Sequence, residues 1–209
     1  MRRNLVTAAI TFALSAATLH APAQTPAEIS RAANPPAVQA TTQLPRNVRP
    51  THYDIEVVPH AERLAFDGKV RINIDVLEPT DTIVLNAVDM TFANVQLGRA
   101  NGKALTPKTR IDAAAQTATF SFDGALPVGS YLLSMEYTGK ISTQANGLFA
   151  IDYDTEAGKK RALYTQFEAP DARRFVPSWD EPNHKATFNL AATVPAGQMA
   201  VSNMTIAQS

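Results

Sequence analysis

An amide and a carboxylate stand two residues apart in the segment 163–168, which reads L-Y-T-Q-F-E. In an extended backbone alternate side chains point to opposite faces, so Gln166 and Glu168 share one face while Leu163 and Phe167 share the other. The apolar side chains can anchor to a core and leave the polar pair free. A carboxylate accepts charge-assisted hydrogen bonds from an ammonium group and an amide adds polar contacts, so this pair suits the α-amine of a peptide.

A plainer interpretation of Glu168 stays open at this point. Arg173 and Arg174 follow a few residues later, and acidic and basic residues close in sequence commonly form solvated ion pairs of little energetic value. In that case Glu168 would hold a turn and bind no ligand.

The segment 170–182, P-D-A-R-R-F-V-P-S-W-D-E-P, is predicted to shape its surroundings and not to touch a ligand. Its prolines leave stretches too short for a stable helix, and an arginine fork binds a carboxylate with good geometry. We therefore predict a structural clamp in which Phe175 and Trp179 are packing anchors. The clamp residues are Asp171, Arg173, Arg174, Trp179, Asp180 and Glu181.

The four histidines form no metal-binding pattern. His52, His60 and His184 are isolated, without a ligand-type partner four residues further on, so we expect histidines of the surface or of strand ends. His20 falls in the N-terminal leader. No serine stands in a G-x-S-x-G elbow. We therefore predict no metal ligand and no catalytic residue in this chain.

Alternation of apolar and polar residues dominates the sequence after residue 44. The stretches 70–76 and 131–137 each place four large apolar side chains on one face, as half-buried strands do. Further strands are expected at 53–58, 82–85, 92–97, 117–122, 148–153, 162–168 and 186–194. Turn pairs such as Asp67-Gly68 and Asp123-Gly124 are expected to separate strands. About nine short strands predict an all-β fold, either an antiparallel β-sandwich or a saddle-shaped sheet.

The composition narrows the class of protein. The chain has 209 residues with 45% hydrophobic content, enough for one sizeable core. Its 19 basic and 19 acidic residues balance, which argues against nucleic acid or an anionic membrane surface as a partner. Because no cysteine occurs, stability must come from packing and not from disulfides.

Residues 1–23 have the features of a secretory signal peptide, namely Arg2 and Arg3, an apolar run over 5–19 and the small residues of Ala21-Pro22-Ala23. The run is shorter than the roughly 20 apolar residues of a membrane-spanning helix. We expect an exported protein, periplasmic or secreted, with no membrane span after signal removal. Residues 24–43, rich in Ala, Pro, Thr and Gln, are predicted to be a disordered linker. The folded domain is then expected over 44–209.

Two segments carry a family resemblance. One is L-P-R-N-V-R-P-T-H-Y-D-I at 44–55, and the other is Y-T-Q-F-E-A-P-D-A-R-R-F-V-P-S-W-D-E-P-N-H-K-A-T-F at 164–188. Together they resemble the N-terminal domain of the zinc aminopeptidases of the aminopeptidase N family, and the resemblance extends over about 44–206. It implies that Glu168 binds the free amine of the substrate and that Gln166 lines the pocket for the first side chain. Ser178 stands where many relatives carry cysteine.

The resemblance implies a zinc ion and a general-base glutamate in an H-E-x-x-H helix, a motif that these 209 residues lack. We therefore expect the substrate-recognition domain of an exported zinc aminopeptidase, a peptide hydrolase whose zinc belongs to a separate catalytic domain. The chain alone is expected to be inactive and to bind no zinc. Its expected partners are peptide N-termini and that catalytic domain. The alternative is a non-catalytic β-rich module that binds peptides or proteins.

The end of the chain is predicted to start a further strand pair at 200–206, A-V-S-N-M-T-I, with no partner strand. The domain would then be incomplete at its C-terminus. An unpaired sheet edge in this region would invite association.

Overall fold

The computed structural model of the chain describes residues 43–99 and 102–207. The predicted signal peptide, 1–23, and the predicted linker, 24–43, lie outside the described residues except for Gln43. In the part that is described, no helix is long and apolar enough to cross a membrane.

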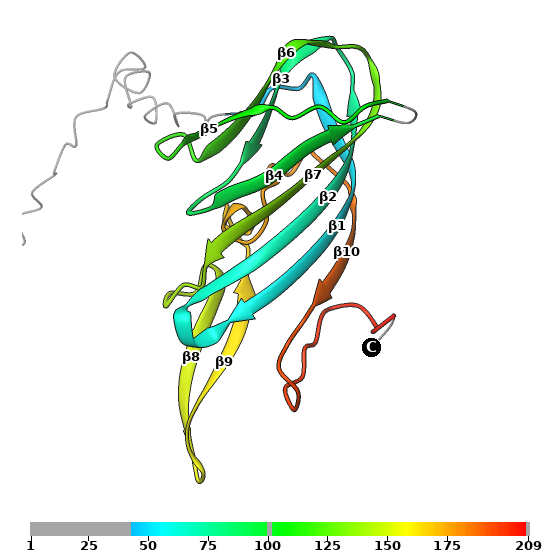
Figure 1. Cartoon of the computed structure of the whole chain (residues 1–209). Helices are drawn as coiled ribbons and strands as arrows, with labels where there is room; N and C mark the ends of the chain where they lie inside the picture. The colour runs from blue at the N-terminus through cyan, green and yellow to red at the C-terminus, as the bar shows by residue number, and fades with distance from the viewer. Residues whose placement is uncertain (1–42, 100–101, 208–209) are drawn as a thin grey trace, which may run out of the picture. The chain divides into compact units, whose positions relative to one another are not determined.

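Ten strands and two short 3₁₀ turns build the described part of the chain (Figure 1). The strands are β1 (Val48–His60), β2 (Ala65–Val76), β3 (Thr80–Asn86), β4 (Thr91–Gly98), β5 (Lys108–Asp112), β6 (Thr117–Leu126), β7 (Gly129–Lys140), β8 (Gly147–Thr155), β9 (Gly158–Gln166) and β10 (Thr187–Ala192). The 3₁₀ turns are η1 (Ala61–Arg63) and η2 (Ala172–Arg174).

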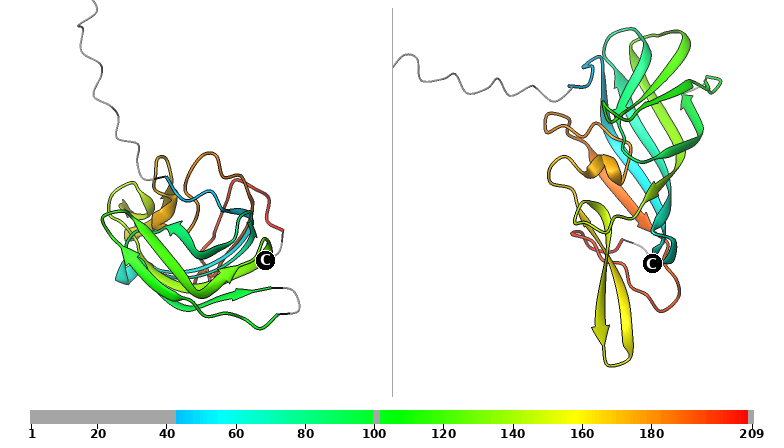
Figure 2. Two further views of the ribbon diagram at one scale, coloured as in Figure 1. Left: turned by 90° about the horizontal axis from the view of Figure 1, so that it is seen from above. Right: turned by 90° about the vertical axis from the view of Figure 1, so that its left-hand side faces the viewer.

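The strands form three sheets. The largest has five strands in the order β10-β1-β2-β7-β4, the second has the order β3-β6-β5, and the third is the hairpin β8-β9. Figure 2 shows the five-stranded sheet twisted and curved, with the β3-β6-β5 sheet at one end of it. Neighbouring strands pair antiparallel except β1 and β10, which run parallel.

The core lies on one face of the five-stranded sheet, where β2 and β7 supply alternate side chains. Val70, Ile72 and Ile74 of β2 are fully buried, and Leu133 and Met135 of β7 are buried against them. The second sheet closes over this face. Phe92 of β4 meets Phe120 of β6 edge to face, with ring centroids 5.7 Å apart, so the two sheets share one hydrophobic core.

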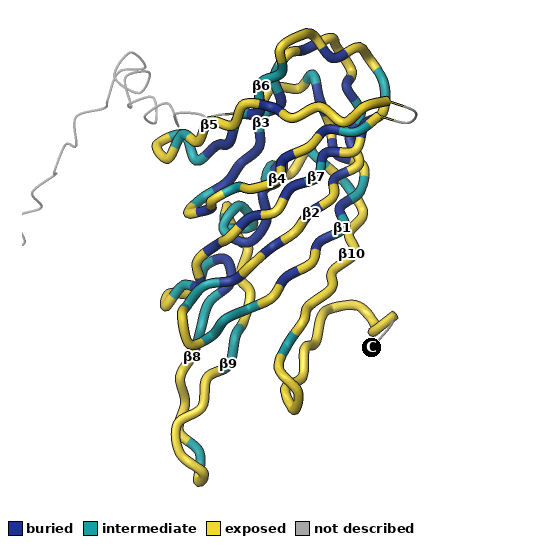
Figure 3. The backbone as a smooth tube through the Cα atoms, in the orientation of Figure 1, coloured by how far each residue is buried: buried dark blue, intermediate teal, exposed yellow. Residues whose placement is uncertain are grey.

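The hairpin β8-β9 extends beyond the rest of the body, and most of its residues are exposed (Figure 3). A two-stranded ribbon is marginally stable by itself in water, so its base must be held by the body. Leu148 at that base is buried in the core, and Arg161 binds Asp152 across the ribbon while donating a hydrogen bond of 2.9 Å to the carbonyl of Ala61. The ribbon is thereby fixed where it leaves the sheet.

The predicted all-β class is confirmed, with three differences in detail. The predicted set of about nine strands lacks β5, whose residues are exposed and show weak alternation. Two expected turns are wrong, because Asp67-Gly68 lies within β2 and Asp123-Gly124 lies within β6. Residue 68 is glycine for a steric reason, because a Cβ there would overlap the ring of Tyr137 on the neighbouring strand. The pairing of β1 with β10 is parallel, whereas the predicted sheet was antiparallel.

The predicted strand pair at 200–206 is wrong, because the structure places no strand after Ala192 within the described residues. The apolar side chains of Met199, Val201, Met204 and Ile206 are between 69% and 84% exposed. Without a neighbouring element to bury them, they gain nothing from adopting a strand. The outer edge of β10 has no strand partner in the described chain, and association through this edge stays a prediction.

Candidate functional site

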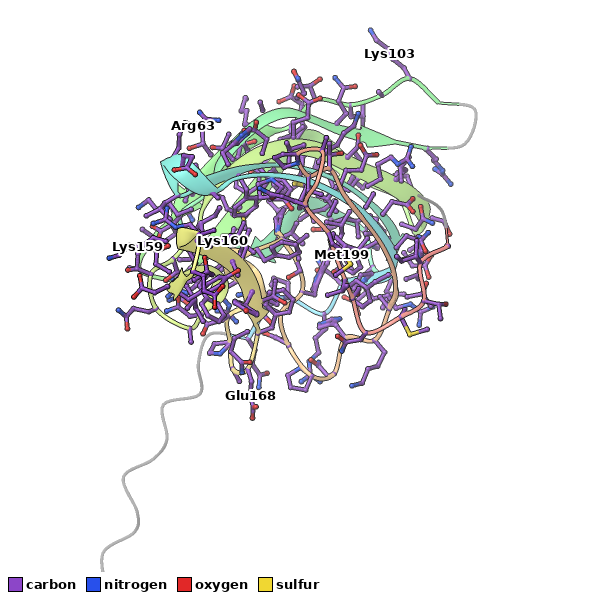
Figure 4. The ribbon with its side chains drawn as sticks, turned by 90° about the horizontal axis from the view of Figure 1, so that it is seen from below. Arg63, Lys103, Lys159, Lys160, Glu168 and Met199 are labelled. Carbon is purple, nitrogen blue, oxygen red and sulfur yellow. The ribbon has the colours of Figure 1, made fainter. Side chains whose placement is uncertain are left out.

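Gln166 is the last residue of β9, and it pairs with Gly147 at the start of β8. Glu168 follows two residues later, and both side chains are exposed. Figure 4 shows Glu168 pointing away from the body of the domain. The predicted amide and carboxylate therefore lie close together in the chain and open to solvent, at the end of a strand.

Glu168 was expected on the strand itself, but β9 ends at Gln166 and Glu168 lies in a turn. The backbone N–H of Asp171 donates a hydrogen bond of 3.0 Å to the carbonyl of Phe167, which closes the turn around Glu168. Arg174 donates from Nε to the carboxylate of Asp171 at 2.7 Å, so the far end of the turn is held as well. The backbone on both sides of Glu168 is thus fixed.

The opposite strand is also brought close. Gly147 has a φ of +60°, a conformation that favours glycine. A Cβ on residue 147 would lie 2.6 Å from Cβ of Arg174, so only glycine allows the start of β8 to pack against this arginine. The base of the ribbon and the turn that carries Glu168 therefore support each other.

The alternative in which Glu168 pairs with Arg173 or Arg174 has no support in the described residues, where Glu168 forms no ion pair. Both arginines bind other carboxylates. Arg173 pairs with Asp180 at 2.9 Å, and Arg174 pairs with Asp171 at 2.7 Å and lies 3.8 Å from Asp89. The carboxylate of Glu168 is thus exposed and has no ion-pair partner among the described residues.

Arg173 and Asp180 form the best-connected ion pair of the predicted clamp. Asp180 accepts hydrogen bonds from Nε and from the backbone N–H of Arg173, and the guanidinium also reaches the amide oxygen of Gln116 at 3.1 Å. Only 12% of the Arg173 side chain and 15% of the Asp180 side chain are exposed. Pairing in such a poorly solvated place stabilises only if further hydrogen bonds satisfy the charged groups, and each of the three side-chain nitrogens of Arg173 donates one.

Backbone bonds attach the clamp to the second sheet. Asn86 at the end of β3 exchanges two backbone hydrogen bonds with Ser178, of 2.8 and 3.1 Å, and its side-chain oxygen accepts from the N–H of Asp180. The N–H of Val88 donates to the carbonyl of Arg173 at 2.9 Å. The segment 173–180 is therefore positioned by the strand β3 on one side and by its own ion pair on the other.

The remaining clamp residues connect to the start of the domain. Trp179 is 5% exposed, and its backbone N–H donates to the hydroxyl of Tyr53. Burial raises the pKa of Tyr53 well above its ordinary value, so this hydroxyl stays neutral. Glu181 accepts a hydrogen bond of 2.7 Å from the N–H of Leu44, the first buried residue of the described chain.

His184 is not the surface histidine that was expected. Its side chain is 8% exposed, lies beside Trp179, and has its Nε2 atom 3.8 Å from a carboxylate oxygen of Glu181. Nε2 has no hydrogen-bond partner in the described structure. Burial lowers the pKa of His184, and Glu181, which favours the charged form, only partly offsets this effect. His184 is therefore held as the neutral imidazole.

Two hollows on the described surface lie elsewhere. One of about 570 Å³ lies beside Asp75, Arg99 and Tyr131, and one of about 360 Å³ lies beside Glu56, Lys69 and other residues of the five-stranded sheet. Gln166 and Glu168 line neither of them. The amide and carboxylate form an open, projecting site on this chain.

Comparison with known proteins decides the family. Residues 49–209 match the family described as the peptidase M1 N-terminal domain. The chain belongs to this family. This M1 N-terminal domain contains the whole described body except its first residues, together with Gln166, Glu168 and every residue of the clamp.

Similar proteins are aminopeptidases. Aminopeptidase N of Acetobacter pasteurianus is 39% identical over 172 residues, which cover 82% of this chain and 47% of that protein. Aminopeptidase M1-C of Oryza sativa subsp. japonica is 36% identical over 79% of this chain and 19% of its own length. Aminopeptidase M1 of Arabidopsis thaliana is 34% identical over 78% of this chain and 19% of its own length. This chain thus spans about half the length of the first of these relatives and about a fifth of the length of the other two.

Membership of the M1 family implies zinc in a whole enzyme. Among residues 43–99 and 102–207, no group of three or more His, Asp or Glu side chains could hold a metal ion. The described residues do not fit zinc, which would need ligands from another part of such an enzyme.

The poorly solvated ion pair should contribute far more stability than an exposed one. Arg173→Ala leaves Asp180 without its main partner, and we expect it to lower the free energy of unfolding by about 3 kcal/mol. Lys108→Ala is the control, since Lys108 and Asp123 are 86% and 95% exposed, and it should change stability by less than about 0.5 kcal/mol. Urea unfolding followed by the fluorescence of Trp179, the single tryptophan, measures both. Equal effects of the two substitutions would contradict a stabilising clamp.

Neutral His184 should make stability depend on pH. Because the pKa of His184 is lowered by folding, the unfolded chain binds the proton more readily, and stability should fall as the pH drops below about 6.5, the ordinary histidine value. The loss levels off once the pH is below the pKa of the folded state. His184→Gln should remove this part of the pH dependence. Urea titrations of both proteins between pH 5 and 8 test it, and parallel curves would show that His184 does not contribute.

Proposed function

We propose that this chain is the substrate-recognition domain of an exported zinc aminopeptidase, which removes N-terminal residues from peptides. In this proposal Glu168 binds the α-ammonium of the peptide, and Gln166 contacts the first residue. The clamp residues are proposed to have a structural role, and zinc is proposed for the whole enzyme only. The partners are then peptide N-termini and a catalytic domain.

The observation that carries the proposal is the state of Glu168. It is an exposed carboxylate without an ion-pair partner among the described residues, and it lies in a turn whose backbone is fixed on both sides. An ammonium group can form up to three hydrogen bonds, and a hydrated carboxylate together with a neighbouring amide offers oxygen acceptors for them. The aminopeptidase names of the relatives support the same substrate class.

Holding the ammonium would set which bond is cut. The first peptide bond lies a fixed number of atoms from the α-amine, so a carboxylate at a fixed place positions that bond and no other at the reacting centre. Such positioning lowers the barrier by fixing geometry before the reaction. Zinc, when bound in the whole enzyme, would supply the polarisation of the carbonyl and the activation of water. The residues of this chain would only bind and orient.

Export to the periplasm or the medium is part of the proposal, and it rests on the signal-like residues 1–23. A chain with no cysteine can function in an oxidising compartment without forming disulfides. Detection of the mature N-terminus near residue 24 in a periplasmic or culture fraction would support this location.

The chain alone should not hydrolyse peptides. The motif H-E-x-x-H is absent from the 209 residues, so we expect no turnover of aminoacyl anilides by the purified chain, with or without added zinc. The whole enzyme, assayed in parallel, is the positive control. Zinc-dependent turnover by the purified chain would contradict the proposal that catalysis belongs to a separate domain.

Glu168→Ala in the whole enzyme should raise KM and lower kcat. The substitution removes a charge-assisted partner of the ammonium that also orients the scissile bond, so kcat/KM should fall about 10- to 100-fold. Glu78→Ala, which removes an exposed carboxylate between β2 and β3, is the matched control and should leave the kinetics unchanged. Unaltered kinetics of Glu168→Ala would defeat the assignment and favour a binding module without turnover.

A further inference from the structure

Phe167 lies between the two proposed contact residues, and its ring turns toward the body. The ring centroid is 5.3 Å from that of Phe175, with an angle of 33° between the planes. Phe175 is 4% exposed, and its ring lies 5.8 Å from that of Phe66, a fully buried residue of β2. Three rings thus lead from the core of the five-stranded sheet to the segment that carries Gln166 and Glu168.

The inner end of this series of rings is rigid. Phe66 meets Tyr137 edge to face with centroids 6.1 Å apart, and the hydroxyl of Tyr137 donates a hydrogen bond of 3.0 Å to the carbonyl of Phe175. Phe175 is therefore held by its ring and by its backbone. Because Phe175 is held in both ways, its ring gives Phe167 a packing partner in a defined position.

The outer end is held at the backbone of Phe167, whose carbonyl accepts the hydrogen bond from Asp171 that closes the turn. Its ring and its carbonyl together determine where the Cα atoms on either side lie. Gln166 precedes this fixed residue directly, and Glu168 follows it directly. The placement of both polar side chains thus depends on a single apolar neighbour.

We propose that Phe167 is the positioning residue of the amine-binding pair, an inference that rests on the function proposed above. Its ring fixes the end of β9 against Phe175, so that Gln166 and Glu168 are ordered before a peptide arrives. Ordering a side chain or loop on binding costs free energy, and ordering it in advance improves affinity. Phe167 itself touches no substrate in this account.

The exposure of Phe167 distinguishes this role from ordinary core packing. Its side chain is 39% exposed, so truncation removes fewer buried contacts than truncation of a core phenylalanine would. The effect of Phe167→Ala should therefore be concentrated at residues 166–168 and not spread over the domain. The chain offers a matched control in Phe188 on β10, which is 61% exposed and stacks on buried Tyr53 with centroids 4.9 Å apart.

The test measures binding of two peptides to the whole 209-residue chain. Leu-Gly-Gly-amide has a free α-amine, and its N-acetylated form lacks the positive charge. Nuclear magnetic resonance of the ¹⁵N-labelled chain follows the backbone amides of Gln166 and Glu168 during each titration, and it detects millimolar affinities. The variants are Phe167→Ala, Phe167→Tyr, which keeps the ring, and Phe188→Ala. Thermal unfolding of each variant is recorded in parallel.

We expect the wild-type chain to bind the free peptide in preference to the acetylated one. Phe167→Ala should weaken binding of the free peptide about 3- to 10-fold, the cost of ordering one or two side chains, and raise the backbone mobility of 166–168. Phe167→Tyr should restore the affinity, and Phe188→Ala should leave it unchanged. The ratio of the affinities for the free and the acetylated peptide measures the preference for a free amine. A purely structural role of Phe167 would not alter this ratio.

Three results would overturn the inference in different ways. A wild-type chain that prefers the free peptide, with equal affinity in Phe167→Ala, excludes the positioning role and leaves the proposed function in place. A wild-type chain that does not distinguish the two peptides excludes amine recognition and the positioning role together. A loss of affinity in Phe188→Ala as large as in Phe167→Ala would show that the effect is one of general stability.

Discussion

The packing of Phe175 against Phe66 buries an irregular segment of the chain against the middle strand of the five-stranded sheet. Phe66 belongs to β2 in the middle of the five-stranded sheet, whereas Phe175 follows η2 in a segment with no strand of its own. Their contact and the hydrogen bond from Tyr137 to the Phe175 carbonyl attach the segment 167–181 to this sheet, together with the bond from the backbone N–H of Trp179 to the hydroxyl of Tyr53. Because irregular segments lack ladder hydrogen bonds, a buried aromatic anchor of this kind determines their position.

The strands with strong alternation were predictable from the sequence, and the irregular connections were not. Val70 to Val76 and Tyr131 to Tyr137 bury every second side chain, because one face of each strand meets the core. The location of Gly68 inside β2 was not visible, since a glycine after an aspartate resembles a turn unless the opposing Tyr137 is known. The parallel neighbour of β1 is likewise determined by contacts across more than 130 residues.

The residues of the candidate site were predictable from the sequence, but most of the contacts that hold them in place were not. The spacing of Gln166 and Glu168 indicated an exposed polar pair, and both side chains are exposed. Sequence alone left the arginines as rival partners of Glu168, because which carboxylate an arginine binds depends on the folded path of the chain. The anchoring of Phe167 to the body was predicted from this alternation and agrees with its contact with Phe175. The close packing of Gly147 against Arg174 was missed, because it depends on the folded path of both segments. His184 was taken for a surface residue because its burial by Trp179 is a tertiary contact.

The charge arrangement of the segment explains why one carboxylate stays free. Asp171, Asp180 and Glu181 each have a partner, namely Arg174, Arg173 and the N–H of Leu44. Since the two arginines are engaged by carboxylates that hold the turn and the loop, no cation of this segment competes for Glu168. An exposed carboxylate loses its hydration only when a ligand binds, so keeping it free costs the fold little. The ion pairs that stabilise the segment therefore leave Glu168 without a partner. The backbone of Glu168 is held in place, but its carboxylate is unpaired.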